Sequence, residues 1–530
     1  MLWAWLACAP EPDLVPLDSP RLLRRVSLDL RGMLPSQAEL DAVEKDPKAL
    51  NGIRADYLED PAFQERLVQI FAERWHTRVE SYYIFHTEFQ HLDSPEMEHP
   101  FEASIGEEPL RLLAHVVAQD RPWGEVVHAD YSFANPLLAS IWPLAWEEGD
   151  VGWQKTYYTD GRPTAGVLSS NGLWWRYQTT LTGNNRGRAN AIARLLVCDD
   201  YATRQVDFEN LPPLSDEAAL EAAIKNVPTC TSCHATLDPI ASTLFGFWIS
   251  VQDSATELST YHTEREAMGP LLLEVEPAWF GTPVRDLEGL GHAISQDPRF
   301  SQCAVQSMAE ATWRRPVDPV QDLPRMQALQ QVYGAHNGQL KQVILALTQT
   351  PEYQAGAFGV GATDQQRETE RTTRMLTPAQ LTVSIEDLTG FVWMDTGFDQ
   401  LDNDKLGFRT MAGGVDGVNT TVPLHTPSLS TTLVAQRLAE GAAFHVMTGE
   451  PFALGGLLEG ADLASRPGDR DFDAVLERLV WRTQGVRPDK EQLQDLGTLW
   501  LDLRALDGTS TLAWQGTLSA LMRDPAFLSY

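Results

Sequence analysis

Apolar side chains in this chain recur at helical spacing, in short runs that stop at Gly or begin after Pro. The run from Leu22 to Leu30 has this spacing and stops at Gly32. A second run opens at Asp60-Pro61 and continues to Trp75. We therefore expect a mainly α, multi-helical protein built from short elements.

A motif of Asp or Thr, then Pro, any residue and an aromatic residue occurs four times, at Asp60–Phe63, Asp297–Phe300, Thr350–Tyr353 and Asp524–Phe527. Asp and Thr are good N-caps, and Pro fits the first helical position, so each copy predicts the start of a helix. Residues 315–353 and 487–527 both begin with a basic residue and Pro, and continue as helix, Gly-containing turn and helix. Residues 29–32 also echo residues 387–390. This repetition predicts two related helical halves.

The length of 530 residues allows two to four domains, each with its own core. We place a Gly-rich, then polar linker between the two halves. The predicted order is a signal or lipoprotein tether at residues 1–19, an N-terminal helical domain at 20–160, a cytochrome-like helical domain at 161–355, the linker at 356–373 and a C-terminal helical domain at 374–530.

The chain is strongly acidic, with 41 Lys and Arg against 73 Asp and Glu and a net charge of −32. Such a surface repels nucleic acids and anionic membranes, so we expect neither as a partner. The acidity fits an interface for a basic redox partner, and it equally fits a solvated acidic surface.

The most informative stretch is Cys230-Thr231-Ser232-Cys233-His234. In the C-x-x-C-H pattern, both thiols form thioethers with the haem vinyl groups and the adjacent His ligates the iron. A Cys230–Cys233 disulfide is an alternative, and a zinc site would need a second ligand pair that the sequence lacks. The pattern predicts a covalently bound haem c, and with it an exported monohaem electron-transfer or redox module.

The second axial ligand is less clearly marked. Met268 is the nearest downstream candidate, and His262 is the runner-up. A Met ligand would raise the reduction potential, whereas an open iron position would favour a haem enzyme. Whether the protein is an enzyme is therefore left open. The apolar residues after the motif fit either the wall of a haem pocket or a helix core, and they are Leu244, Phe245, Phe247 and Trp248. A further alternative is a non-redox structural or binding protein of the cell surface, in which a Cys230–Cys233 disulfide staples a loop.

The other three cysteines bear on cellular location. Cys8 ends a short apolar run before a Pro-rich polar stretch, as in the lipidated Cys of a bacterial lipoprotein. We therefore expect export to the periplasm or cell surface, with membrane contact only through this lipid anchor. Cys198 and Cys303 are left over, and they form either one structural disulfide or two separate buried thiols.

Four stretches together resemble a known family: Ala165–Ser169, Arg186–Asn190, Leu195–Cys198 and the motif extended to Asp238-Pro239. They resemble the cytochrome-like proteins of planctomycetes and myxobacteria, which are built of several modules, mostly domains of unknown function. The resemblance covers most of residues 20–355 and, more loosely, 374–530. It implies an exported, largely helical protein with a single C-x-x-C-H haem site, and it names no reaction. The turn that follows the motif in this family is replaced here by Ile240-Ala241-Ser242.

Overall fold

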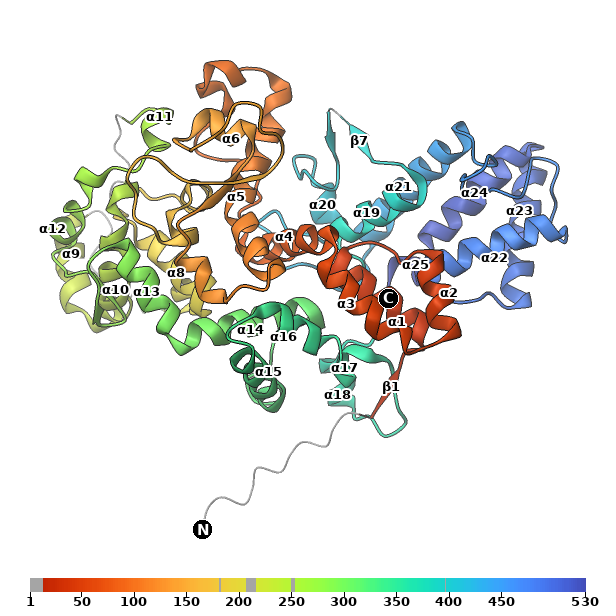
Figure 1. The fold of residues 1–530 in the computed structure, drawn as a ribbon, viewed down its shortest axis with the longest axis horizontal. Helices are drawn as coiled ribbons and strands as arrows, with labels where there is room; N and C mark the ends of the chain where they lie inside the picture. Colours follow the sequence, from red (N-terminus) through yellow and green to blue (C-terminus); the bar gives the residue numbers. More distant parts are fainter. Residues whose placement is uncertain (1–12, 181–182, 206–215, 249–252, 396) are drawn as a thin grey trace, which may run out of the picture. The chain divides into compact units, whose positions relative to one another are not determined.

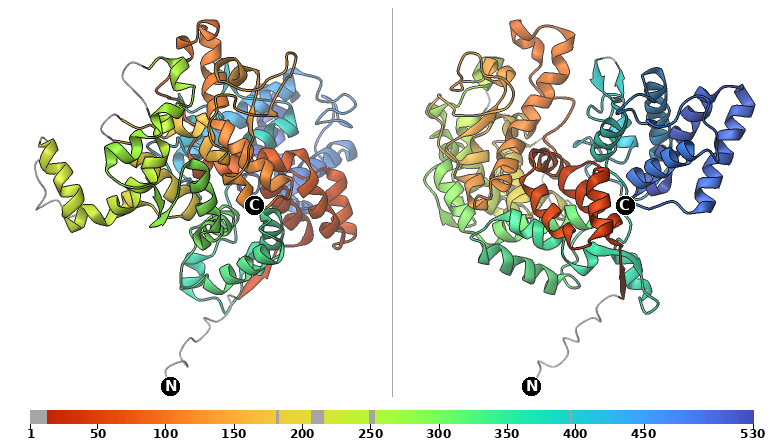
Figure 2. Two further views of the ribbon diagram at one scale, coloured as in Figure 1. Left: turned by 60° about the vertical axis from the view of Figure 1, so that its left-hand side comes forward. Right: turned by 45° about the vertical axis from the view of Figure 1, so that its right-hand side comes forward.

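The computed structural model describes residues 13–180, 183–205, 216–248, 253–395 and 397–530 (Figure 1). Most of the regular secondary structure of these residues is helical, and the strands form only small two-stranded ribbons (Figure 2). The prediction of a mainly α, multi-helical protein is confirmed.

The chain forms two compact units, each assembled from separate segments. Unit 1 contains Met1–Glu73, Ala309–Arg325 and Ile344–Tyr530, and unit 2 contains Arg74–Met308 and Met326–Val343. Unit 1 therefore draws on both predicted halves. The predicted domain limits at residues 160, 355 and 373 stay predictions about modules, since the compact units interleave the segments differently.

The helices that belong to unit 1, wholly or in large part, are α1 (Ser19–Arg31), α2 (Gln37–Lys45), α3 (Ala49–Glu59), α4 (Pro61–Trp75), α17 (Pro351–Gln354), α18 (Asp364–Thr369), α19 (Pro378–Thr389), α20 (Phe408–Met411), α21 (Leu429–Thr448), α22 (Arg470–Gln484), α23 (Lys490–Asp507), α24 (Ser510–Arg523) and α25 (Pro525–Leu528). Its strands are β1 (Leu14–Pro16), antiparallel to β6 (Ala355–Phe358), and the hairpin of β7 (Met394–Asp395) with β8 (Phe398–Asp399). The core centres on Phe472, whose ring lies 4.6 Å from that of Trp514 and 5.3 Å from that of Trp500.

Two predicted connecting segments contain regular structure. Within the predicted tether at 1–19, β1 pairs with β6. The predicted linker at 356–373 includes most of β6 and the helix α18. Backbone pairing to β1 thus orders the Gly-rich part of the linker, which local composition does not reveal.

The helices of unit 2 are α5 (Glu98–Ala118), α6 (Pro136–Ile141), α7 (Asn171–Arg176), α8 (Arg186–Val197), α9 (Glu217–Asn226), α10 (Pro228–Ala241), α11 (Ala255–Leu258), α12 (Met268–Leu273) and α13 (Leu287–Gln296). Three further helices have residues in both units: α14 (Pro298–Trp313), α15 (Leu323–Ala335) and α16 (Leu340–Leu347). Short 3-10 helices are η1 (His86–Glu88), η2 (Gln90–Leu92), η3 (Pro95–Met97), η4 (Trp123–Val127), η5 (Gly166–Ser169), η6 (Tyr201–Thr203), η7 (Ser242–Phe247) and η8 (Thr263–Arg265). The strands β2 (Ser132–Ala134) and β3 (Gln154–Thr156) pair antiparallel, as do β4 (Ala278–Trp279) and β5 (Thr282–Pro283).

A buried carboxylate holds the centre of unit 2 together. Glu108 of α5 accepts hydrogen bonds from the hydroxyls of Ser132 and Tyr158 and from the backbone N–H of Gly172. Burial raises the pKa of Glu108, although these hydrogen bonds oppose that shift. Each carboxylate oxygen has a donor, so Glu108 joins α5 to β2 and α7.

All four copies of the Asp/Thr-Pro motif start a helix as predicted. The first residue accepts a backbone N–H at 2.9 Å for Asp60, 2.9 Å for Asp297, 3.3 Å for Thr350 and 2.7 Å for Asp524. The helices that follow are α4, α14, α17 and α25.

The predicted correspondence between residues 315–353 and 487–527 is found in the order of elements. In the first segment α15, a turn with Gly338 at φ 81°, and α16 lead into α17. In the second, α23, Gly508 at φ 76°, and α24 lead into α25. Both turns need the left-handed conformation that glycine adopts without strain.

Candidate functional site

The C-x-x-C-H motif lies on α10, which packs against α8 and α9 (Figure 1). The helix begins at Pro228, a residue suited to the first turn. Cys230, Cys233 and His234 are spaced i, i+3 and i+4, so they lie on one face of the helix. Both thiols are free and half-buried. The Cys230–Cys233 disulfide of the alternative hypothesis is not formed in this structure.

His234 is oriented by a carboxylate one turn further along α10. Its Nδ1 lies 3.0 Å from Asp238 Oδ1. Arg186, at the start of α8, donates to both oxygens of Asp238, at 2.7 Å from Nε and 3.1 Å from Nη2. Asp238 is only 5% exposed. The buried ion pair of Asp238 and Arg186 therefore fixes the orientation of the His234 imidazole ring.

The charge state of Asp238 decides the tautomer of His234. Burial raises the pKa of Asp238, but the hydrogen bonds from His234 and Arg186 outweigh it and hold the pKa below its usual value. An ionised Asp238 accepts a hydrogen bond from the Nδ1–H group of His234. The lone pair of the neutral imidazole ring then lies on Nε2 and is available. Metal-bound histidines use the same carboxylate contact to fix their ring orientation.

A second arginine, Arg204, interacts with the motif. Arg204 donates to Asp199 at 2.8 Å, and this hydrogen bond is the main cause of its raised pKa. Cys233 is among the groups whose charge acts on Arg204. The thiol of Cys233 therefore lies within electrostatic reach of a guanidinium.

The two candidate axial ligands come from elements other than α10. Met268 is half-buried at the start of α12, and its neighbour Gly269 lies against the backbone carbonyl of Ser242. Ser242 is eight residues after His234, which is roughly 12 Å along a helix axis. His262 has both ring nitrogens engaged, Nδ1 with Glu264 and Nε2 with the backbone carbonyl of Glu257, each at 3.0 Å.

The apolar residues after the motif belong to the core. Leu244 and Phe245 of η7 are fully buried. Phe247 packs on Trp174 with ring centroids 5.9 Å apart, and Trp248 stacks on Phe245 at 5.7 Å. The helix α10 continues through Pro239 to Ala241, and the 3-10 helix η7 follows it directly.

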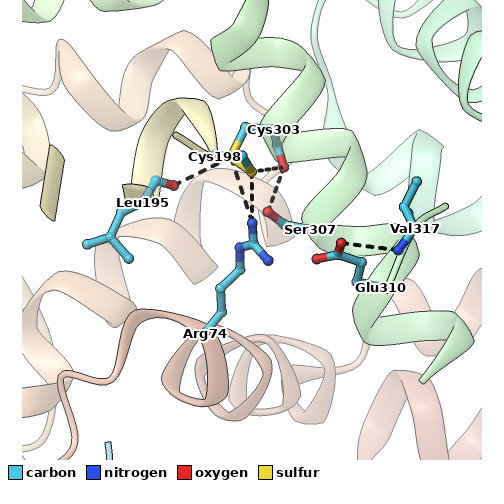
Figure 3. Close-up of a disulfide and its surroundings, with 7 residues drawn as sticks. All are labelled: Arg74, Leu195, Cys198, Cys303, Ser307, Glu310 and Val317. Carbon is cyan, nitrogen blue, oxygen red and sulfur yellow. Dashed lines mark hydrogen bonds between the residues drawn. A yellow bond between two sulfur atoms is a disulfide. The ribbon is translucent and has the colours of Figure 1, made fainter. Parts of the chain in front are cut away.

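Cys198 and Cys303 form a disulfide that joins the end of α8 to α14 (Figure 3). Their Cα atoms are 5.3 Å apart, within the range that a disulfide requires. Cys198 ends α8 in the left-handed conformation at φ 56°. The guanidinium of Arg74 approaches the sulfur of Cys198 to 2.8 Å. Of the five cysteines, only Cys8 lies outside the described residues.

Two kinds of feature are absent from the part of the chain that the structure describes. No group of three or more His, Cys, Asp or Glu side chains within them is placed to hold a metal ion. None of the described helices is both long and apolar enough to cross a membrane.

The fold and site thus define a mainly helical protein with a helix-borne C-x-x-C-H motif. Residues 17–144 match the family model described as "PSD4: Protein of unknown function (DUF1592)". This match covers about a quarter of the chain and ends before α10. No curated protein and no solved structure matches the chain. The similarity to a domain of unknown function agrees with the part of the sequence resemblance that concerns such domains. It assigns no chemistry, which must therefore be argued from the residues of the site.

Sequence reasoning found Cys230, Cys233 and His234 but did not anticipate the partners of His234. Arg186 and Asp238 were visible only as parts of stretches that carried the family resemblance. Their separation by 52 residues hides the ion pair from any local pattern.

Proposed function

We propose that α10 carries one covalent haem c and that the protein is an exported monohaem electron-transfer module. One observation supports this most strongly. Two free thiols and a His with an available Nε2 share one face of α10. Covalent attachment requires thiols that are unpaired, because each adds across one vinyl double bond of the porphyrin.

The residues around the motif fit this cofactor in their chemistry. Cys230 and Cys233 would tether it, and His234 would ligate its iron through Nε2. Asp238, held by Arg186, would keep the imidazole ring in one orientation and increase its basicity. The bound haem would supply a one-electron redox couple, with a potential set by its axial ligands and surroundings.

Location and partners follow from other features. The Cys198–Cys303 disulfide agrees with an oxidising compartment. We propose the periplasm or cell surface, with a lipid on Cys8 as the only membrane contact. The net charge of −32 favours a basic protein as the redox partner and disfavours nucleic acid.

The decisive experiment exports the full-length chain in a host with cytochrome c maturation machinery and measures covalent haem as the pyridine haemochrome. We expect one haem per chain, and none in the Cys230→Ala/Cys233→Ala double variant. Ser232→Ala, at the exposed position between the two thiols, is the matched control and should keep its haem. Exported wild-type protein that is folded by circular dichroism yet lacks covalent haem would contradict the proposal.

The sixth iron position separates an electron-transfer module from a haem enzyme. We propose Met268, which requires α12 to move relative to α10. A Met ligand raises the reduction potential, so Met268→Ala should lower it, whereas Leu271→Ala on the exposed side of the same helix should not. An unchanged potential in Met268→Ala would favour an open iron position and enzymatic chemistry.

A further inference from the structure

Unit 2 contains a cavity of about 270 Å³ that is separate from the C-x-x-C-H motif. Five aromatic side chains belong to its lining: Tyr83, Trp174, Trp175, Phe247 and Trp248. None of Cys230, Cys233 and His234 lines it. Its volume is close to the lower end for sites that bind small organic molecules.

A buried arginine, Arg188, belongs to the lining of this cavity. Arg188 is 3% exposed and donates to the backbone carbonyls of Tyr177, Trp174 and Phe247 and to the side-chain oxygen of Asn185. None of these acceptors is charged. Burial lowers the pKa of Arg188 to about 9, and no carboxylate offsets that shift. A buried cation balanced only by dipoles is costly, so an anion beside it is favoured.

The other charged groups of the lining already have partners. Arg265 binds Asp253 through two hydrogen bonds of 2.7 and 2.9 Å. Glu257 lies exposed and accepts the backbone N–H of Ser254 at 2.7 Å. Arg265, Asp253 and Glu257 together carry one positive and two negative charges. Among the described lining residues, Arg188 is thus the arginine without a carboxylate partner.

Trp248 contributes a further donor to the lining. The indole Nε1 of Trp248 is buried and has no hydrogen-bond partner among the described residues. The other two indoles of the wall do have acceptors, since Trp174 donates to Leu168 and Trp175 to Leu258. Buried polar groups are normally paired, so this N–H is open to an acceptor that a ligand supplies.

We propose that this cavity binds a small carboxylate with a flat aromatic body. The carboxylate lies toward Arg188 and the indole N–H of Trp248, and the ring packs among the aromatic side chains. Charge-assisted hydrogen bonds recognise the carboxylate, and ring packing recognises the flat body. A neutral sugar would also stack on the indoles, but it would leave the charge of Arg188 without a counter-ion.

The first test compares ligands on the unmodified full-length chain. Phenylacetate and phenylacetamide have the same ring and differ in charge, so isothermal titration with both isolates the carboxylate. We expect phenylacetate to bind at least tenfold more tightly than the amide, and acetate, without the ring, to bind at least tenfold more weakly than phenylacetate. Equal binding of acid and amide, binding of glucose in preference to phenylacetate, or no binding of phenylacetate at millimolar concentration would each overturn the proposal.

The second test places the ligand in this cavity. Trp248→Phe keeps an aromatic ring and removes the N–H, so phenylacetate affinity should fall about three- to tenfold while phenylacetamide affinity changes less. Tyr157→Phe, at an exposed aromatic position outside the lining, is the matched control and should leave phenylacetate affinity unchanged. Circular dichroism and melting of each variant confirm its folding. A folded Trp248→Phe protein with wild-type affinity for phenylacetate would overturn the assignment of the site.

Discussion

At the scale of single residues, the candidate site depends on an ion pair that no local pattern reveals. The spacing of Cys230, Cys233 and His234 was readable because all three lie within five residues on one helix. Arg186 and Asp238 meet only after α8 packs on α10. The sequence thus predicted the groups that would touch a haem, and the fold revealed what holds His234 in place.

Asp238→Asn should destabilise the folded protein at neutral pH. The substitution leaves Arg186, which is 23% exposed, without its carboxylate, and we expect a loss of about 1–3 kcal/mol in the free energy of unfolding. Urea unfolding of wild type and variant at pH 7 measures the difference. Asp56→Asn, at an exposed position of α3, serves as control.

The same pair predicts the pH dependence of this difference. The pKa of Asp238 in the folded state lies below that of an unfolded Asp, about 3.9. The stabilisation is therefore complete above that value and is lost as the pH falls through the folded pKa. The gap between wild type and Asp238→Asn should narrow below about pH 4. A gap that stays constant from pH 7 to pH 3 would contradict the role given to Asp238.

The disulfide is the second prediction at this scale. Cys198 and Cys303 are 105 residues apart, so their bond restricts a long loop in the unfolded chain. On the chain-entropy model it contributes up to ~4.7 kcal/mol. Dithiothreitol should lower the melting temperature of the wild type and leave that of Cys198→Ser unchanged. A melting temperature of Cys198→Ser equal to that of the oxidised wild type would show that the bond adds no stability.

At the scale of elements, the Asp/Thr-Pro motif was predictable because N-capping acts within three residues. The side chains that donate hydrogen bonds to the carbonyl groups at the ends of these short helices were not predictable. Arg24 of α1 donates to the carbonyl of Phe527, and its neighbour Arg25 donates to those of Tyr353 and Ala355. Two adjacent arginines thus hold the ends of α25 and α17, which are corresponding helices of the two predicted repeats. Both arginine side chains are buried. The local sequence of α1 does not predict this burial.

Thr350→Ala should cost about 0.5–2 kcal/mol of stability, because it removes the side-chain cap of α17. Thr350→Ser keeps the hydroxyl and should stay close to wild type. Thermal unfolding followed by circular dichroism compares the three proteins. If Ala and Ser variants melt at the same temperature, the cap does not contribute to stability.

At the scale of the whole molecule, fold class was accessible from the sequence, and the assembly of the compact units was not. Hydrophobic spacing and caps are local, whereas unit 1 joins chain segments hundreds of residues apart. The aromatic cavity of unit 2 escaped prediction for the same reason, since its lining comes from residues 83–84, 171–180, 188, 247–248 and 253–265. Repetition in the sequence suggested a division near residue 373. That division stays a prediction, and residues of the first helices and of the C-terminal segment share one core.

Three contacts carry this last prediction, all within unit 1. Gln380 donates to the backbone carbonyl of Leu28 at 2.8 Å, Arg374 binds the carboxylate of Asp29 at 2.9 Å, and Trp481 donates to Asp41 at 2.9 Å. A fragment of residues 374–530 would lose α1 and α2, and with them the partner of the buried Arg374. Losing one partner of a buried ion pair typically costs about 3–5 kcal/mol, a large share of the stability of a domain.

We therefore expect residues 374–530 to lack a cooperative thermal transition when produced alone. Co-production with residues 1–73 should restore one, because that segment supplies Leu28, Asp29 and Asp41. Asp29→Ala in the added segment should weaken the restoration, and Asp46→Ala, on the exposed end of α2, should not. Circular dichroism on heating, together with co-purification of the two fragments, gives the result. A fragment 374–530 that melts cooperatively without any partner would show that the boundary at residue 373 delimits an autonomous domain, and that α1 and α2 only cover a core which is already complete.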